Sequence, residues 1–251
     1  MAGTAVLGRL TWRVADVISV RAETASARTL VLDVPGWPGH LAGQHVDLRL
    51  TAEDGYSTER SYSIANAPAG SRVELTVQRV DGGEVSTYLV EDVRAGDRME
   101  LRGPVGGYFV WHPEWTDRVL LLAGGSGVVP LMGIARTAVA AAAAAPLRLI
   151  YSVRRPEDVL YAAELDQLAA GASLGVRYAY TRAGPGGRPD RVGRVDRVGR
   201  VDAGVLAGSG WPAAVKPLCY VCGPTAFVEA MADLLVAAGH ESTRVRTERF
   251  G

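Results

Sequence analysis

The pattern of the sequence changes near residue 113, and this change predicts two domains of different architecture. Up to Val110, short segments rich in β-branched or alternating residues are separated by Gly, Pro and Asp, a pattern typical of strands and turns. From Arg118 onward, apolar segments of strand length alternate with segments of helical pattern. Regularly spaced strands indicate a small barrel, and the alternation indicates a parallel, doubly wound sheet. We therefore predict an N-terminal antiparallel β-barrel domain at residues 1–113 and a C-terminal α/β domain with a parallel sheet at residues 114–251.

The two patterns place individual elements along the chain. In the first domain, strands are expected at residues 14–20, 29–34, 45–50, 61–65, 72–80 and 97–102. In the second domain, strands are expected at residues 119–123, 147–153, 176–181, 218–222 and 243–250, with helices at 128–144, 161–169 and 225–238. The alanine tract at 138–145 favours extension of the first of these helices. A six-residue unit at 191–196 is repeated at 197–202, and its period is too short for a repeat architecture.

Charge and hydropathy exclude several functional classes. The chain has 27 basic and 27 acidic residues, so no global positive field recruits nucleic acid or anionic lipid. The longest uncharged run, residues 119–135, contains glycines and Pro130 and is explained better by a strand, a turn and a helix than by a membrane span. The sequence does not open with a basic segment followed by an apolar stretch, as a signal peptide would. We therefore expect a cytoplasmic protein.

The two cysteines limit the redox chemistry that the chain can carry by itself. Cys219 and Cys222 are the only cysteines, whereas an iron–sulfur cluster normally takes four. Their spacing matches a redox dithiol, but that motif belongs near the start of a thioredoxin-like unit. One strand cysteine and one turn cysteine acting separately is the better interpretation. Any cluster is expected on another protein, and we predict no metal site.

The segment Arg60-Ser61-Tyr62-Ser63 places a charged group and an aromatic group at alternate positions. Residues two apart in a strand share a face, so Arg60 and Tyr62 project together while Ser61 and Ser63 project to the other side. A guanidinium beside a flat aromatic ring can hold a phosphate beneath a stacked ring system. The alternative is an exposed sheet edge on which Arg60 and Tyr62 face solvent.

A glycine turn at residues 81–83 leads into Glu84, Val85 and Ser86. Ser86 is expected to cap a short helix, so that backbone amides from Gly83 to Ser86 face phosphate oxygens. The alternative is a plain hairpin turn followed by a helix cap.

A second glycine turn, Gly125-Ser126-Gly127, stands between a predicted buried strand and a predicted helix that contains Pro130. A glycine turn in this position is where the pyrophosphate of a dinucleotide lies, at the positive end of the helix dipole. The alternative is a plain structural turn. Proline is tolerated in the first helical turn, which supports this placement. No Gly-Lys-Ser/Thr follows, which excludes a Walker loop, and Val128 occupies the final glycine position of a nucleophile elbow, which excludes that motif.

Five motifs, taken in order, resemble those of the ferredoxin–NADP⁺ reductase family and span nearly the whole chain. They are RSYS at 60–63, GPVG at 103–106, GSGVVP at 125–130, CGP at 222–224 and ERF at 248–250. Each motif alone is weakly specific, whereas five in this order are highly specific. The resemblance implies a FAD-binding barrel, an NAD(P)-binding α/β domain and an oxidoreductase without a fused iron–sulfur domain.

On the flavin side, the resemblance implies that Arg60 binds the FAD pyrophosphate with Ser61 beside it. Tyr62 would stack on the isoalloxazine, and Ser63 would approach the flavin N5. Because strand alternation turns Ser63 away from Tyr62, this approach requires the backbone or a bend at the end of the strand. Residues 83–86 would hold the FAD diphosphate.

On the nicotinamide side, the resemblance implies that residues 125–130 hold the NAD(P) pyrophosphate. Cys222 and Gly223 would flank the nicotinamide, with Pro224 in the same segment. Phe250 matches the family's aromatic residue near the C-terminus, which covers the flavin, and Glu248 matches the family's nearby carboxylate. Gly251 after Phe250 departs from the family's pattern. The predicted catalytic side chains are therefore Tyr62, Ser63, Cys222, Glu248 and Phe250.

Arginines after the second and third strands of the α/β domain favour NADPH over NADH, because a 2′-phosphate calls for arginine. Arg154 and Arg155 follow the second strand, and Thr181 with Arg182 follows the third, which matches the family's hydroxyl and arginine pair for this phosphate. Arg191 is a further candidate, with an arginine-rich surface loop as the alternative.

Three functional hypotheses follow from this resemblance. In the first, hydride passes from NADPH to bound FAD, and electrons pass on to a separate acceptor such as ferredoxin, flavodoxin or an oxygenase or other metalloenzyme component. In the second, the protein is a flavin reductase that uses free flavin as a diffusible substrate. In the third, it is a non-catalytic subunit that binds a partner in response to nucleotide. The redox chemistry belongs to the cofactors, and the protein supplies their alignment.

Overall fold

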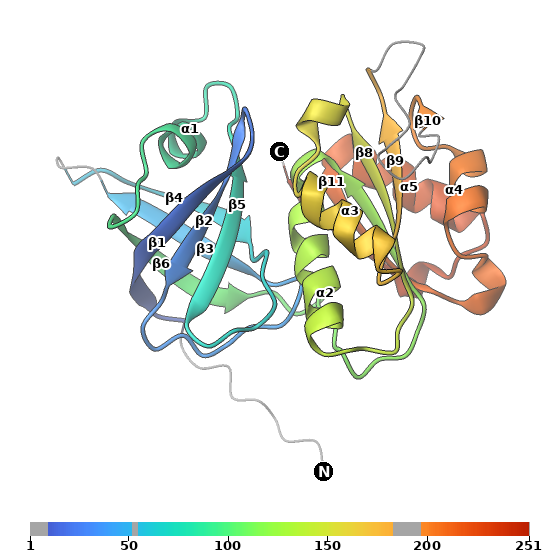
Figure 1. Cartoon of the computed structure of the whole chain (residues 1–251), viewed down its shortest axis with the longest axis horizontal. Coiled ribbons are helices and arrows are strands. Elements are labelled where there is room, and N and C mark those ends of the chain that lie inside the picture. The colour runs from blue at the N-terminus through green and yellow to red at the C-terminus, as the bar shows by residue number, and fades with distance from the viewer. Residues whose placement is uncertain (1–9, 52–54, 183–196, 251) are drawn as a thin grey trace.

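The computed structural model describes residues 10–51, 55–182 and 197–250, which form two domains side by side (Figure 1). The strands of the first domain are β1 Trp12–Thr24, β2 Ala27–Asp33, β3 His45–Thr51, β4 Ser57–Ser63, β5 Arg72–Gln78 and β6 Arg98–Val105. They form an antiparallel sheet in the order β4-β3-β6-β1-β2-β5. A bridge between Ile64 and Leu75 joins the continuation of β4 to β5, so the two edges of the sheet meet as in the predicted barrel.

The interior of the barrel is filled by alternate residues of its strands. Leu30 and Leu32 of β2 and Val46 and Leu48 of β3 are fully buried in one apolar cluster, as period-two alternation requires. Helix α1 (Glu84–Glu91) adds Leu89 and its apolar neighbours to the same cluster.

Helix α1 begins earlier than the sequence pattern predicts. Its first residue is Glu84 and its N-cap is Gly83, so the prediction that Ser86 caps the helix is wrong. The Ser86 hydroxyl lies inside the first turn, where it donates to the carbonyl of Gly83 at 3.1 Å and accepts the amide of Val80 at 3.1 Å. A serine three residues into a helix bonds back to the preceding carbonyl when no better acceptor is near.

The second domain is a six-stranded parallel sheet in the order β10-β9-β8-β7-β11-β12. Its strands are β7 Val119–Gly124, β8 Leu147–Val153, β9 Gly175–Tyr180, β10 Arg197–Val198, β11 Leu218–Pro224 and β12 Val245–Phe250. Its helices are α2 Val128–Ala140, α3 Ala162–Ala170, α4 Ala203–Ser209 and α5 Thr225–Ala237. Leu121 of β7 packs with α2 and α3, while Leu120 and Leu122 pack with α4 and α5. Helices therefore cover both faces, which confirms the predicted doubly wound arrangement.

Two local features of this domain differ from the prediction. Helix α2 ends at Ala140 and not near residue 144, since Ala140 and Ala141 are exposed and Ala142 adopts a left-handed conformation with φ of 48°. Alanine favours a helix only weakly when no face of it is buried. Helix α4 was not predicted; the carboxylate of Asp202 caps it by accepting the amide of Val205 at 3.0 Å.

The seam between the domains is tightly packed along α2. A Cβ atom added to Gly133 would lie 2.8 Å from the carbonyl oxygen of Ile64, so the helix backbone rests directly on the barrel. In the segment between β6 and β7, the carbonyl of Val110 accepts hydrogen bonds from Tyr220 at 2.8 Å and from Arg246 at 2.6 Å. The division after residue 113 falls within this connecting segment and stays a prediction.

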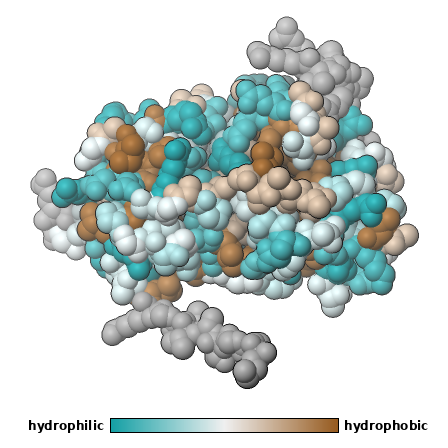
Figure 2. Space-filling view, turned by 60° about the horizontal axis from the view of Figure 1, so that its bottom comes forward, coloured by the Kyte–Doolittle hydropathy of each residue, from teal (hydrophilic) through white to brown (hydrophobic). Residues whose placement is uncertain are grey.

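The outer surface is mixed in character. Figure 2 shows apolar side chains in small groups separated by hydrophilic ones, and scattered apolar residues of this kind are ordinary on protein surfaces. No helix in the described part of the chain is long and apolar enough to span a bilayer.

Candidate active site

A cleft of about 1190 Å³ lies between the barrel and the α/β domain. It is larger than the roughly 300–1,000 Å³ of a typical small-molecule pocket, so it has room for more than one ring system. The predicted residues that line it are Ser61, Tyr62, Ser63, Gly125, Ser126, Pro130, Arg154, Thr181, Pro224, Glu248 and Phe250. The predicted residues that lie outside its walls are Arg60, Gly83, Glu84, Val85, Ser86, Gly127, Arg155, Arg182, Cys222 and Gly223. Arg191 lies outside the described residues.

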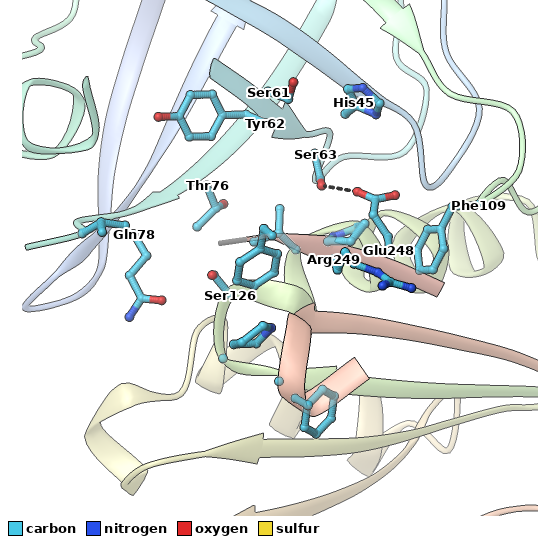
Figure 3. A pocket seen from close by; sticks show the side chains of 18 of the residues that line it. His45, Ser61, Tyr62, Ser63, Thr76, Gln78, Phe109, Ser126, Glu248 and Arg249 are labelled. Carbon is cyan, nitrogen blue, oxygen red and sulfur yellow. Dashed lines mark hydrogen bonds between the residues drawn. The ribbon is translucent and has the colours of Figure 1, made fainter. Parts of the chain in front are cut away.

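Ser63 and Glu248 meet across the cleft from opposite domains. The Ser63 hydroxyl, at the end of β4, donates to Oε1 of Glu248 on β12 at 3.3 Å (Figure 3). Burial raises the pKa of Glu248 above its ordinary value, and the bond from Ser63 only partly offsets this effect. A carboxyl group with a raised pKa beside a hydroxyl can hold or pass on a proton.

Tyr62 presents its ring to the same cleft as Ser63, although strand alternation would separate the two. Ser63 is the last residue of β4, and both side chains reach the cleft at this strand end (Figure 3). Burial raises the pKa of Tyr62 to about 12, although nearby Arg60 lowers it slightly. The phenol is therefore neutral at physiological pH, which suits a stacking platform. Ser61 donates to Oδ1 of Asp47 at 2.8 Å.

The structure does not bring Arg60 to the wall of the cleft. Its guanidinium instead donates to Oγ1 of Thr58 at 3.2 Å and to the carbonyl of Glu59 at 2.7 Å, in an exposed setting. The sequence predicted that Arg60 and Tyr62 share one face of the strand. In the structure, only Tyr62 lines the cleft.

The turn before α1 lies at the rim of the cleft. Val80 and Asp81 line the cleft and lead directly into Gly83 and the first turn of the helix. The first amides of a helix have no partner within it, so this turn can donate to an anion placed at the rim. The predicted diphosphate role of residues 83–86 stays a prediction.

The second glycine turn packs against the end of β11. Gly125 to Gly127 form a single 3₁₀ turn, with Gly125 at φ of 54°. A Cβ atom on Gly127 would lie 2.1 Å from the carbonyl oxygen of Cys222, so only glycine permits this approach. Gly125 and Ser126 of this turn, with Pro130 in the first turn of α2, form one wall of the cleft, and Gly127 lies behind it.

Cys222 is buried directly behind that wall and is paired with Glu248. The two residues are register partners in the parallel pair of β11 and β12, and Cys222 is 1% exposed. Burial and the negative charge of Glu248 raise the pKa of the Cys222 thiol well above its ordinary value. The thiol therefore stays protonated and can contact a ligand only after a local shift of the chain.

The two predicted arginines after β8 lie in different places. Arg154 lines the cleft together with Thr181, whereas Arg155 lies outside it and pairs with Glu157 at 3.7 Å. Arg182 also lies outside, and its amide donates to the carbonyl of Arg154 at 2.9 Å. The structure thus favours Arg154 and Thr181 among the residues predicted to contact a 2′-phosphate.

Sequence reasoning missed several residues that line the cleft, namely His45, Thr76, Gln78, Tyr108 and Phe227. His45 is the register partner of Ser63, and burial lowers its pKa below the ordinary value. The place of His45 in the cleft follows from the pairing of β3 with β4, which the sequence pattern does not reveal. Thr76 and Gln78 alternate on β5, and the alternation alone does not reveal that this face meets a second domain.

These residues fit the two ligands that the sequence implies. The barrel side offers the neutral ring of Tyr62 and the hydroxyl of Ser63, as a flavin ring requires. The other side offers a glycine turn at a helix N-terminus, where an added Cβ on Gly125 would meet only open space. A dinucleotide phosphate can approach such a backbone closely.

Comparison with known proteins agrees with this geometry. The family model of the oxidoreductase FAD-binding domain matches residues 15–110, and that of the oxidoreductase NAD-binding domain matches residues 121–233. Ferredoxin–NADP reductase B of Sorangium cellulosum is 36% identical over 213 residues, which are 83% of this chain and 84% of that protein. The chain belongs to the ferredoxin–NADP reductase family. It therefore combines a FAD-binding and an NAD-binding domain, as predicted.

Two further comparisons show how this member relates to longer proteins. The ferredoxin reductase component of 3-ketosteroid-9-alpha-monooxygenase from Mycolicibacterium smegmatis is 33% identical over 95% of this chain, which spans only 64% of that protein's length. The FAD/NAD-binding domain of a nitric oxide dioxygenase from Vibrio cholerae O1 biovar El Tor has the same fold, with a TM-score of 0.82, 24% identity, and coverage of 95% of this chain and 98% of that domain.

Proposed function

We propose that this protein is an NADPH-dependent FAD oxidoreductase that delivers electrons to a separate acceptor protein. The acceptor would be a ferredoxin, a flavodoxin or an oxygenase or other metalloenzyme component. The observation that carries the proposal is the meeting of Ser63 and Glu248 in the cleft, because it joins the flavin-side motif and the nicotinamide-side motif at one point. The relative from Mycolicibacterium smegmatis, named as a monooxygenase reductase component, supports an oxygenase-type acceptor.

When bound, FAD would supply the redox chemistry of the cleft, namely acceptance of hydride from NADPH and release of electrons one at a time or as a pair. Tyr62 would pack against the flavin ring, and Ser63 with Glu248 would hold a proton at the edge of that ring. Phe250, which lines the cleft and is 38% exposed, would cover the flavin until the nicotinamide takes its place. Residues 125–130 would fix the pyrophosphate of NADPH, with Cys222 behind the nicotinamide.

NADPH is preferred over NADH on the strength of Arg154 and Thr181, which line the cleft together. A guanidinium and a hydroxyl suit a 2′-phosphate, whereas a free ribose calls for a carboxylate. We further propose that the FAD-binding domain ends near residue 113 and that the protein acts in the cytoplasm.

The absorption spectrum of the purified protein tests this proposal. It should show the visible bands of bound flavin, and these should bleach on anaerobic addition of one equivalent of NADPH and more slowly with NADH. A colourless protein with saturable kinetics in added flavin would instead indicate a flavin reductase with a diffusible substrate. Bound flavin that no pyridine nucleotide bleaches would reject electron transfer and favour a non-catalytic subunit.

A further inference from the structure

A chain of hydroxyl groups joins the α/β domain to the barrel at the cleft. The Tyr161 hydroxyl donates to Oγ1 of Thr76 at 2.5 Å, and Thr76 and Thr29 share a hydrogen bond of 2.7 Å between their hydroxyls. Thr29 in turn donates to Oε1 of Glu23 at 2.7 Å. Each hydroxyl has one proton, so Thr29 donates to Glu23, Thr76 donates to Thr29 and Tyr161 donates to Thr76.

Of the three hydrogen bonds in this series of hydroxyl groups, only the bond between Tyr161 and Thr76 crosses from one domain to the other. Tyr161 stands directly before α3 of the α/β domain, whereas Thr29 and Thr76 belong to β2 and β5 of the barrel. Thr76 also lines the cleft, and Figure 3 shows it below Tyr62 on the cleft side of the barrel. The position of Thr76 in the cleft is thus tied to an element of the other domain.

Tyr161 is itself held firmly in place. It is 4% exposed and adopts the left-handed conformation, with φ of 57° and ψ of 30°, which is rare for a bulky residue and persists only where the surroundings impose it. The guanidinium of Arg136 lies 4.7 Å from the centre of its ring. A residue that keeps an unfavourable backbone conformation is a candidate for a specific role.

Arg136 adds a second set of contacts across the same seam. It donates to the carbonyl of Ala65 in the barrel at 2.9 Å and lies 3.6 Å from the carboxylate of Glu74 on β5. Within its own domain it donates to both carboxylate oxygens of Glu164, at 2.8 and 2.6 Å. The ring of Tyr161 is therefore packed against a side chain that also fixes α2 to the barrel.

We propose that Tyr161 is a positioning residue, which sets the width of the cleft through its hydrogen bond to Thr76. This inference rests on the proposed function, because cleft width matters only if a ring carried by each domain must stack on the other. Hydride transfer between stacked rings depends steeply on their separation, and a misplacement of about 1 Å can cost roughly a hundredfold in rate. Loss of the Tyr161 hydroxyl should therefore slow the transfer without weakening the binding of either cofactor.

The test compares Tyr161→Phe, which removes only the hydroxyl, with a matched control from the same network. Thr29→Val removes the hydroxyl that bonds Thr76 and Glu23 inside the barrel and leaves the contact across the seam intact. We expect Tyr161→Phe to lower the rate of anaerobic flavin reduction at saturating NADPH by about tenfold, with the dissociation constants for FAD and NADPH within twofold of wild type. Thr29→Val should keep the wild-type rate. Equal slowing in both variants, or an unchanged rate in Tyr161→Phe, would overturn the inference.

Two further measurements separate positioning from a general loss of structure. In a Thr76→Val background, adding Tyr161→Phe should change the rate by less than twofold, because the bond is already absent. Independent additive losses would contradict a role through Thr76.

In the FAD-free protein, amide exchange of residues 161–170 should be faster in Tyr161→Phe than in wild type or Thr29→Val, and equal exchange in all three would count against the inference. If wild-type flavin is not reduced by NADPH at all, the proposed function fails, while amide exchange still decides whether Tyr161 joins the domains.

Discussion

The hydroxyl of Ser63 and the carboxylate of Glu248 lie 3.3 Å apart, although the two residues are separated by 185 positions in the chain. One terminates a strand of the barrel, and the other belongs to the last strand of the parallel sheet. Because Glu248 is also the register partner of Cys222, a single contact links the flavin-side and nicotinamide-side motifs.

Glu248→Gln should change how stability depends on pH. A carboxyl whose pKa is raised on folding contributes stability below its unfolded pKa, about 4.3, and loses it as pH rises through the folded value. Glutamine does not titrate, so the variant does not lose stability in this way. Its free energy of unfolding relative to that of wild type should therefore rise between about pH 4 and about pH 7.5. Urea unfolding of both proteins at these two pH values measures the effect. A constant difference between them would show that Glu248 is not the titrating group.

Tyr62→Ala should weaken FAD binding because it removes the aromatic platform of the barrel side. Loss of a stacked ring costs about 2 kcal/mol, which corresponds to roughly a thirtyfold higher dissociation constant. Tyr62→Phe keeps the ring and should bind FAD within about threefold of wild type. Fluorescence titration of the FAD-free proteins measures both, and an equal loss in the two variants would assign the effect to the hydroxyl.

Gly127→Ala should destabilise the α/β domain. The added Cβ would lie 2.1 Å from the carbonyl oxygen of Cys222, so the turn has to move, at a cost of about 1–3 kcal/mol. Gly208→Ala is the matched control, because a Cβ there meets nothing within 4 Å on helix α4 and should stabilise by up to about 1 kcal/mol. Chemical denaturation measures the free energy of unfolding of both variants and of wild type. A Gly127→Ala protein as stable as wild type would refute the close approach of Gly127 to Cys222.

Arg154→Ser should raise the KM for NADPH at least tenfold and leave the KM for NADH nearly unchanged. A hydrogen bond to a charged group contributes about 1.5–3 kcal/mol, and about 1.4 kcal/mol is a factor of ten. Arg155→Ser provides the comparison, since this neighbour lies outside the cleft beside Glu157. If Arg155→Ser discriminated more strongly between the nucleotides than Arg154→Ser, the nucleotide would have to lie outside the cleft seen here.

The sequence predicted those parts of the fold that follow from local periodicity. The six buried residues of β7 and the glycine turn after it carry their own signals, since an apolar run followed by glycine marks a strand end. Helix α4 was missed because its seven residues are too few for a clear helical period. The end of α2 was placed too late because alanine propensity says nothing about burial.

The residues that line the cleft from β5 could not be predicted in the same way. Thr76 and Tyr161 are 85 positions apart and belong to different domains, so their contact depends on how the domains dock. His45 faces the cleft because of strand pairing with Ser63, which a single sequence does not encode locally. The motif resemblance identified Ser63 and Glu248. Which other residues line the cleft beside them depends on how the two domains pack together.

A crystal structure of the protein with FAD bound tests the central claim most directly. The account predicts that the flavin ring lies in the cleft against Tyr62, with Ser63 and Glu248 at its edge and Phe250 next to its exposed face. A flavin bound elsewhere on the protein, with the contact between Ser63 and Glu248 remote from its ring, would contradict the account.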